Sequence, residues 1–311
     1  MEHDRPLERY MAILRGELLP SFLRTRVQDV DGRSPLDLKI DAADRLCNEC
    51  QLCEHRCRTR RGGGQAGRCG VQESRVASHF PHYGEERPLV PSYTVFLSGC
   101  NLDCVYCQNW DISTRPDQGD IIPPERMARL IEGRTICPPG SPACRGIRNV
   151  NWVGGDPIPH LPYVLRVLRE LRSPVPQVWN SNMYMTVETL EILDGTMDVF
   201  LTDLKYGNDR CALEISSAPR YWEVVTRNHE LAARQGELIV RHLLLPGHLE
   251  CCTFPVLEWL ARELPRTPVN IMDQYRPEHM ARSRHGLGRG IRPEEHEAAL
   301  RKARELGLTL I

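Results

Sequence analysis

The cysteines of this chain are crowded into one stretch, and that crowding limits how the stretch can fold. Eight of the 13 cysteines in the 311 residues lie between Cys47 and Cys107. Disulfides rarely persist in a reducing compartment, so closely spaced thiols indicate ligands for a soft metal or an iron-sulfur cluster. An odd number of cysteines also fits poorly with a complete disulfide framework. We therefore expect this stretch to be ordered by metal.

Three of these cysteines form a C-x3-C-x2-C motif directly after the strand-like run TVFLS, namely Cys100, Cys104 and Cys107. A loop this short can hold three corners of a cubane cluster, and it offers no fourth cysteine, so one iron lacks a nearby protein ligand. The amino and carboxylate groups of S-adenosylmethionine (SAM) can chelate that iron. One electron then breaks a carbon-sulfur bond and releases a 5'-deoxyadenosyl radical. The alternative is a zinc site that takes its fourth ligand from elsewhere in the chain.

The rest of the chain alternates β-rich runs with amphipathic segments, which is typical of repeated βα units and a parallel sheet. We expect an α/β fold, a partial (β/α)6 TIM-type barrel over 93–280. Around it we expect an N-terminal helical extension over 1–46, a cysteine-rich metal-binding segment over 47–92 and a C-terminal helical tail over 281–311. The expected strands are 93–98, 149–153, 177–182, 198–205, 237–245 and 269–273, and the expected helices lie near 124–133, 160–172, 186–194, 221–235 and 254–264.

Several sequence blocks carry a family resemblance. The run CNLDCVYCQNW, followed by VGGDP, WNSNMYMT, TDLKYGND, RHLLLPGH and VNIMDQYRP, resembles the PflX-like branch of the radical SAM superfamily, the pyruvate formate-lyase activating enzyme homologues. The likeness spans about residues 47–280. It implies a partial barrel, a [4Fe-4S] cluster and SAM, with Tyr106 beside the last cysteine. It further implies a reductant such as flavodoxin or ferredoxin.

Two motifs at strand ends are candidates for holding SAM. Gly154, Gly155 and Asp156 are similar to the GGEP segment of the superfamily, with Asp in place of Glu, and missing side chains let a backbone approach a ligand closely. An ordinary tight turn is the alternative. Asp203 and Lys205 point to the same side of a strand end and are similar to the D-x-K motif of glycyl-radical-enzyme activases. By that likeness Lys205 pairs with the SAM carboxylate and Asp203 forms a polar site beneath it, whereas the alternative is a surface ion pair.

Two further candidates lie on neighbouring strands. Ser181 and Asn182 occupy the place of a D-T-N-type segment, and Asn180 in place of Asp lowers the local negative charge, which counts against a cation site there. Arg241 is flanked by apolar residues and needs an anionic partner if buried. That partner is either a SAM or substrate carboxylate or an internal salt bridge.

A second cysteine group precedes the barrel. Cys47, Cys50, Cys53 and Cys57 read C-x2-C-x2-C-x3-C, close to a bacterial ferredoxin run, although Arg58 replaces its proline. The family resemblance instead selects Cys50, Cys53, Cys57 and Cys69 and leaves Cys47 out. Four thiolates saturate a metal, so we expect a structural or electron-relaying site, of zinc or of a second [4Fe-4S] cluster.

Charge and hydropathy exclude other classes of protein. Lys plus Arg number 40 and Asp plus Glu 41, so the balance gives no reason to expect a nucleic acid or an anionic membrane as partner. No window resembles a membrane span and the N-terminus MEHDRPLERY is too charged for a signal peptide, so we expect a cytoplasmic protein. Eight further cysteines and histidines either contact the substrate or have incidental local roles, and the sequence does not distinguish the two: Cys137, Cys144, Cys251, Cys252, His79, His82, His242 and His248.

The leading hypothesis is an enzyme that cleaves SAM and abstracts hydrogen from a peptide or protein, including the activation of a glycyl radical enzyme. The second hypothesis is radical modification of a small molecule or a ribosomal peptide. The non-enzymatic hypothesis is a zinc-organised binding module.

Overall fold

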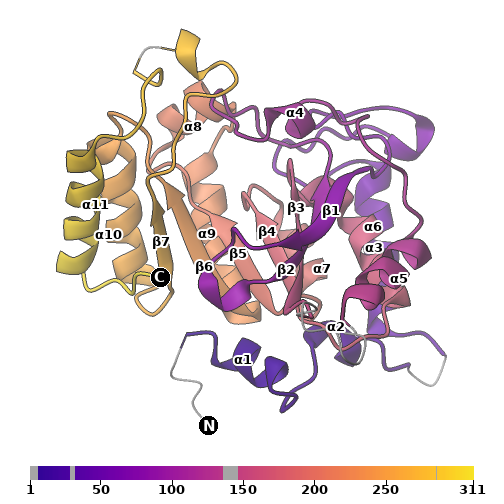
Figure 1. Cartoon of the computed structure of the whole chain (residues 1–311). Coiled ribbons are helices and arrows are strands. Elements are labelled where there is room, and N and C mark those ends of the chain that lie inside the picture. Colours follow the sequence, from indigo (N-terminus) through magenta and orange to yellow (C-terminus); the bar gives the residue numbers. More distant parts are fainter. Residues whose placement is uncertain (1–5, 29–31, 136–145, 285) are drawn as a thin grey trace.

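A seven-stranded sheet forms the centre of the protein, with its strands in chain order (Figure 1). The computed structural model describes residues 6–28, 32–135, 146–284 and 286–311. An antiparallel strand precedes six parallel ones, and the two outermost strands do not pair with each other within the described residues, so the barrel is open. The strands are β1 (Val76–His82), β2 (Ser92–Leu97), β3 (Asn149–Gly154), β4 (Gln177–Ser181), β5 (Val199–Asp203), β6 (Glu237–Leu243) and β7 (Val269–Met272).

The six parallel strands coincide with the six predicted runs, which confirms the partial (β/α)6 barrel. Their sequences are nearly continuous in buried residues, as in β4, because helices cover parallel sheets. The five predicted barrel helices also form, on the outside of the sheet (Figure 1). They are α5 (Pro124–Thr135), α6 (Leu161–Glu170), α7 (Val187–Leu193), α9 (Tyr221–Gln235) and α10 (Phe254–Glu263).

Strand β1 and helix α8 (Asp209–Ser216) were not predicted. β1 is an edge strand whose residues are only partly buried, and it contains Pro81, which is tolerated at sheet edges but weakens a strand prediction. The eight-residue α8 follows β5 directly and is capped by Asn208, whose side chain accepts from the backbone N–H of Cys211. Both unpredicted elements contribute to the sites described below.

Five further helices complete the described structure. Helix α3 begins with a capping box between Ser34 and Asp37 and packs against α6 and α7. The last helix packs against α10. These elements are α1 (Glu8–Leu14), α2 (Ser21–Arg24), α3 (Pro35–Asn48), α4 (Trp110–Ser113) and α11 (Pro293–Glu305).

The N-terminal helices cover the amino ends of the strands. The Glu237 carboxylate, at the start of β6, accepts from the backbone N–H groups of Leu7 and Arg9 at 3.1 and 2.8 Å. The Asp198 carboxylate, just before β5, accepts from the N–H of Ser21 at 2.7 Å. With that end of the barrel covered, the opposite end carries the functional loops. Among the described helices, none combines the length and apolar character needed to span a membrane.

Candidate active site

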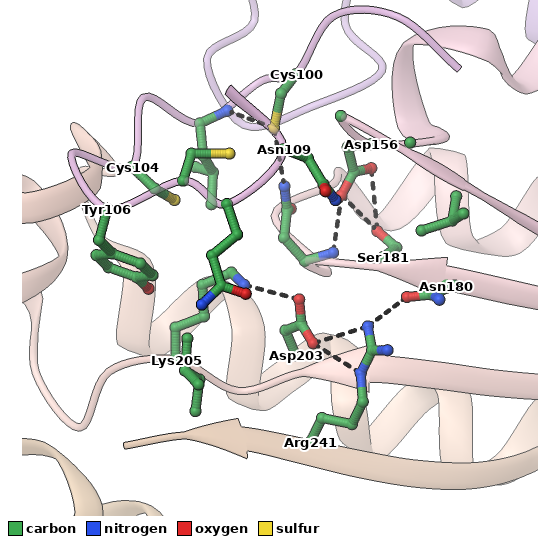
Figure 2. Close-up of a pocket in the computed structure, with 18 of the residues that line it drawn as sticks. Cys100, Cys104, Tyr106, Asn109, Asp156, Asn180, Ser181, Asp203, Lys205 and Arg241 are labelled. Carbon is green, nitrogen blue, oxygen red and sulfur yellow. Dashed lines mark hydrogen bonds and ion pairs between the residues drawn. The ribbon is translucent and has the colours of Figure 1, made fainter. Parts of the chain in front are cut away.

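The carboxyl ends of the parallel strands surround a cavity of about 230 Å³ (Figure 2). All the residues that the sequence predicts for the cluster and for SAM line this cavity. They come from the loop after β2 and from the ends of β3, β4, β5 and β6. In (β/α) barrels this end carries the reactive groups, because the loops there converge from many strands.

The three cysteines of the loop after β2 each receive a polar contact at sulfur. Leu102 donates its backbone N–H to Cys100 Sγ at 3.4 Å, and Ser216 at the end of α8 donates its hydroxyl to Cys104 Sγ at 2.9 Å. Cys107 Sγ lies 3.3 Å from Ser113 Oγ. Such hydrogen bonds favour thiolates and tune iron-sulfur clusters.

Burial works against the thiolate form. It raises the pKa of Cys100, and it raises the pKa of Cys104 to about 11. A buried thiol of this kind ionises at neutral pH when a metal cation compensates the charge. The cavity lining contains three thiols and no fourth among the described residues. The donor set therefore fits a cubane cluster with one iron open to an external ligand.

Gly154 and Gly155 permit a close approach between two segments of the protein itself. Gly154 has φ +136°, and a Cβ there would lie 2.1 Å from the carbonyl oxygen of Leu97. A Cβ on Gly155 would lie 2.1 Å from the carbonyl oxygen of Gly99, the residue before the first cysteine. The glycines thus let the end of β3 lie directly against the cysteine loop, while both residues still line the cavity.

Asp156 orients the end of β4. Its buried carboxyl accepts from the N–H of Asn182 at 2.8 Å, from the hydroxyl of Ser181 at 3.2 Å and from the N–H of Ile158 at 2.9 Å. Burial raises the pKa of this carboxyl to about 7, against the opposing effect of these donors. Asn182 in turn donates to the side chain of Asn101 in the cysteine loop at 2.8 Å. Asp156 therefore positions the polar residues that face the cavity.

Asp203, Lys205 and Arg241 form a partly buried ionic group on the opposite wall (Figure 2). Lys205 Nζ lies 2.7 Å from the Asp203 carboxylate, and Arg241 Nε lies 3.0 Å from it. Burial alone would raise the pKa of Asp203, but the charges of Arg241 and Lys205 outweigh it and lower the pKa to about 2. Arg241 also contacts Asn180 and lies 3.6 Å from Glu85. Of the alternatives left open for Arg241, the structure shows the internal salt bridge, and the Asp203–Lys205 pair is partly buried in the cavity wall and is not an exposed surface pair.

Two residues of this site lie on, or directly after, elements that the sequence does not predict. Glu85, the second anion near Arg241, follows β1, and Ser216, the partner of Cys104, ends α8. Neither belongs to a motif, so no sequence signal marked them. Tyr106 turns inward, and its hydroxyl accepts from that of Tyr206 at 3.2 Å, which anchors the cysteine loop to the core.

The second cysteine group lies apart from the cavity. Burial raises the pKa of Cys53 to about 12, and the negative charges of Cys69, Cys50 and Cys57 raise it further. Arg68 donates its backbone N–H to Cys57 Sγ at 3.3 Å. These four are the residues that the family resemblance selected.

A buried arginine joins this group to the barrel. The Arg61 guanidinium donates to the carbonyl of Pro159 at 2.7 Å, after β3. Burial raises the pKa of Cys69, and the Arg61 charge opposes that shift. A cation beside buried thiols favours their ionised, metal-binding form.

The other open candidates do not line the cavity. His79 contacts the Tyr93 hydroxyl, and His242 contacts the carbonyl of Leu204, so both serve local hydrogen bonds. His82 Nδ1 lies 3.3 Å from the carboxylate of Glu85, and Cys251 and Cys252 lie in a turn after β6. Cys137 and Cys144 fall outside the described residues.

A family model and several known proteins match this chain. A family model described as "Radical SAM superfamily" matches residues 94–260. The chain is 42% identical over 282 residues to an uncharacterized protein of Methanocaldococcus jannaschii, covering 89% of this chain and 80% of that protein. It is 25% identical over 166 residues to the pyruvate formate-lyase-activating enzyme of Staphylococcus aureus strain USA300, covering 50% of this chain and 62% of the enzyme. A crystal structure of methylornithine synthase aligns with a TM-score of 0.48 and 13% identity over 97% of this chain and 78% of that one.

Proposed function

Because this chain belongs to the radical SAM superfamily, whose members are enzymes, we propose that its cavity holds a [4Fe-4S] cluster beside SAM and that the protein abstracts hydrogen from a peptide or protein substrate. One observation carries the proposal. Three cysteine thiols and a buried polar wall face the same cavity, and the described lining has no fourth thiol. The site thus has the donors for a cluster and an open position for SAM.

Cys100, Cys104 and Cys107 are the proposed cluster ligands. A bound cluster of this type supplies the electron that breaks a carbon-sulfur bond of SAM and yields the 5'-deoxyadenosyl radical. The hydroxyl of Ser216 and the N–H of Leu102 stabilise charge on two of the three sulfurs.

The polar wall is the proposed SAM site. Lys205 is partly buried, and although burial lowers its pKa, the adjacent Asp203 carboxylate raises the pKa above its ordinary value, so the ammonium stays charged at neutral pH. A charged ammonium can pair with the SAM carboxylate. The carbonyls of Gly154 and Gly155 are the proposed acceptors for its amino group, and Ser181 and Asn182, fixed by Asp156, complete the wall.

The substrate proposal rests on the likeness to an activating enzyme and on the surface near the cavity. Trp110 follows the cysteine loop by three residues, is 36% exposed, and stacks on His279 with ring centroids 5.9 Å apart. Met280 beside it is also exposed. Exposed large apolar side chains near a catalytic cavity suit contact with another polypeptide. We propose a peptide or protein substrate on this surface, including the glycine loop of a glycyl radical enzyme.

The remaining components are also proposals. The four-cysteine group of Cys50, Cys53, Cys57 and Cys69 is proposed to hold zinc or a second [4Fe-4S] cluster. Flavodoxin or ferredoxin is the proposed reductant. The eleven described cysteines are all free thiols, which suits a reducing cytoplasm.

Two measurements test the proposal. Anaerobically purified protein should be brown, contain iron and sulfide, and form 5'-deoxyadenosine from SAM when a reductant is added. Colourless protein that contains zinc alone would instead support a binding module. For the substrate, deuterium from a labelled candidate partner protein should appear in 5'-deoxyadenosine, whereas label arriving from a small molecule would contradict the protein substrate.

A further inference from the structure

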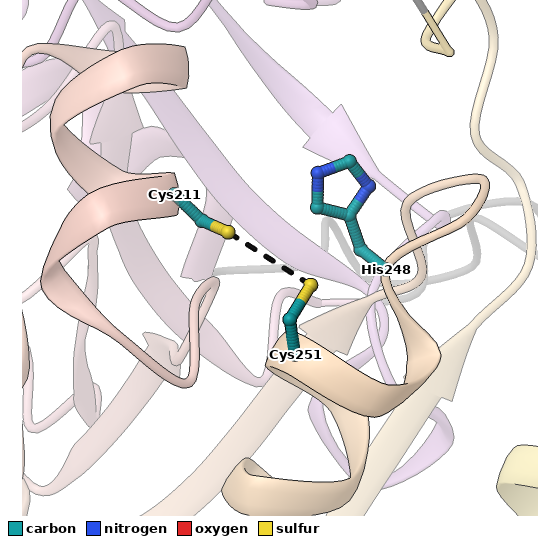
Figure 3. A group of neighbouring side chains, drawn as sticks. All are labelled: Cys211, His248 and Cys251. Carbon is teal, nitrogen blue, oxygen red and sulfur yellow. Dashed lines mark hydrogen bonds between the residues drawn. The ribbon is translucent and has the colours of Figure 1, made fainter.

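A separate group of soft donors lies outside the cavity, on the loops that follow β5 and β6 (Figure 3). Cys211 lies in the first turn of α8. His248 and Cys251 lie at the π-helical turn Leu249–Thr253. The two sulfurs and an imidazole nitrogen all lie within 4.8 Å of one another. None of the three residues lines the cavity described above.

The spacing of the two sulfurs matches that of a tetrahedral zinc site. Cys211 Sγ and Cys251 Sγ are 3.8 Å apart. Two thiolates bound to Zn²⁺ at about 2.3 Å with a tetrahedral angle are separated by about 3.8 Å. A disulfide requires about 2.05 Å between the sulfurs. The observed separation therefore fits two ligands of one ion.

The histidine is held in the tautomer that a metal requires. His248 Nδ1 lies 3.0 Å from the carbonyl oxygen of Pro246. A carbonyl only accepts, so Nδ1 carries the proton and Nε2 keeps a lone pair. Metal-binding histidines typically donate their other ring N–H to such a carbonyl or to a carboxylate.

Asn208 supports the same arrangement from the other side. Its amide nitrogen donates to the carbonyl of Cys251 at 2.6 Å and contacts Cys211 Sγ at 3.4 Å. One side chain thus joins the α8 loop to the π-helical turn and offers a donor to a sulfur. Gly207 permits this closeness, because a Cβ there would lie 2.7 Å from the carbonyl oxygen of Cys252.

We propose that Cys211, His248 and Cys251 bind one Zn²⁺ ion, with the fourth coordination position open to water or an external ligand. Two sulfurs and one imidazole form a donor set that zinc accepts, and three protein ligands are typical of zinc sites that keep one position free. His248 and Cys251 are three residues apart on a helical turn, so both can face the same ion. The ion ties α8, which follows the loop that contains Lys205, to the loop after β6.

Metal analysis of the anaerobically purified full-length protein tests this site. The parent, His248→Ala and Cys251→Ala proteins are incubated with Zn²⁺, freed of loose metal by gel filtration, and analysed for zinc, iron and sulfide. Both substituted residues are only partly buried, so the fold should tolerate the changes. His296→Ala, which alters a partly buried histidine on α11, is the matched control.

Each ligand variant should contain one zinc per chain fewer than the parent, with iron and sulfide unchanged, and the control should keep the parental zinc. The difference between proteins is decisive, because the four-cysteine group can also take zinc. X-ray absorption at the zinc edge should show a nitrogen contribution that His248→Ala loses. Equal zinc in all four proteins would overturn the site, and so would a Cys211–Cys251 disulfide in the anaerobic protein. If the parent protein does not cleave SAM but the ligand variants still contain one zinc fewer than the parent, only the function proposed above is refuted, and the zinc site stands.

Discussion

The loop of Cys100, Cys104 and Cys107 and the group of Cys50, Cys53, Cys57 and Cys69 contain similar spacings in different surroundings. The first faces a cavity with an ionic wall opposite its sulfurs. The second is enclosed by its own loop and by Arg61, and its members lie outside the cavity lining. A group of three thiols that faces a cavity leaves a metal position open to an external ligand. A group of four thiols outside the cavity can fill every position of its metal, so the number and surroundings of the thiols distinguish the two proposed sites.

The two regions are nevertheless joined. His55, between two members of the four-cysteine group, contacts the carbonyl oxygen of Asn101 in the three-cysteine loop through Nε2 at 2.8 Å. His160 contacts Ser98 just before that loop at 2.9 Å, and Ser74 after the four-cysteine group at 3.1 Å. Variants in one region can therefore be compared with variants in the other within one folded unit.

The largest expected difference concerns catalysis. Cys104→Ser should abolish 5'-deoxyadenosine formation from SAM, because it removes one of three proposed cluster ligands, whereas Cys69→Ser should retain it. The measurement is product formation per iron under reducing, anaerobic conditions. Equal rates in the two variants would reverse the roles assigned to the two regions.

The second difference concerns stability. Cys69→Ser should lower the free energy of unfolding by roughly 4 kcal/mol, because the loss of a buried metal ligand is among the costliest substitutions. That corresponds to a fall in Tm of about 6 °C for a chain of this size. Cys47→Ser is the control, since Cys47 is left out of the predicted ligand set and should shift Tm by a few degrees at most. A larger shift with Cys47→Ser would favour the ferredoxin-like grouping.

A third comparison concerns SAM binding at the ionic wall. Lys205→Gln should raise the KM for SAM about tenfold, a loss of about 1.4 kcal/mol, because the carboxylate of SAM loses its charged partner. Lys39→Gln, on α3, serves as the control and should leave KM unchanged. An unchanged KM in Lys205→Gln would contradict the proposed contact with SAM and would indicate that Lys205 serves to pair with Asp203.

The smallest effect concerns the link between the two regions. Burial lowers the pKa of His160 from its ordinary 6.5 to about 3 in the folded protein. A base whose pKa is lowered on folding contributes stability that is present above pH 6.5 and is lost as pH falls toward 3, by up to about 1.4 kcal/mol per pH unit. Chemical unfolding at pH 7.5 and 5.5 should show a weaker loss in His160→Gln than in the parent. The same slope in both proteins would show that other groups account for it.

The sequence predicted the barrel well because helices cover its parallel strands, whose residues are largely buried, as in β4. The predicted site residues all line one cavity, since they sit in short motifs at strand ends, where parallel strands must bring them together. Asp203 and Arg241 are an example: they belong to separate motifs, and their register pairs them directly.

The sequence could not predict contacts between distant segments that carry no motif. Glu85 contacts Arg241 from the loop that follows β1, an edge strand whose sequence gives only a weak strand signal. Cys211 meets Cys251 across 40 residues because two neighbouring loops converge, and nothing in their separate spacings indicates it. Periodicity reports which face of an element is buried, whereas the pairing of distant loops depends on the folded geometry.

Helix α8 contributes a residue to each of two proposed metal sites. Cys211 lies in its first turn, and Ser216 at its last residue donates to the sulfur of Cys104. Hydrogen bonds to cluster sulfurs raise the reduction potential of the iron by stabilising the more negative, reduced state. If zinc binding displaces α8, the hydrogen bond from Ser216 to Cys104 changes. The driving force for reduction of the cluster then changes with it.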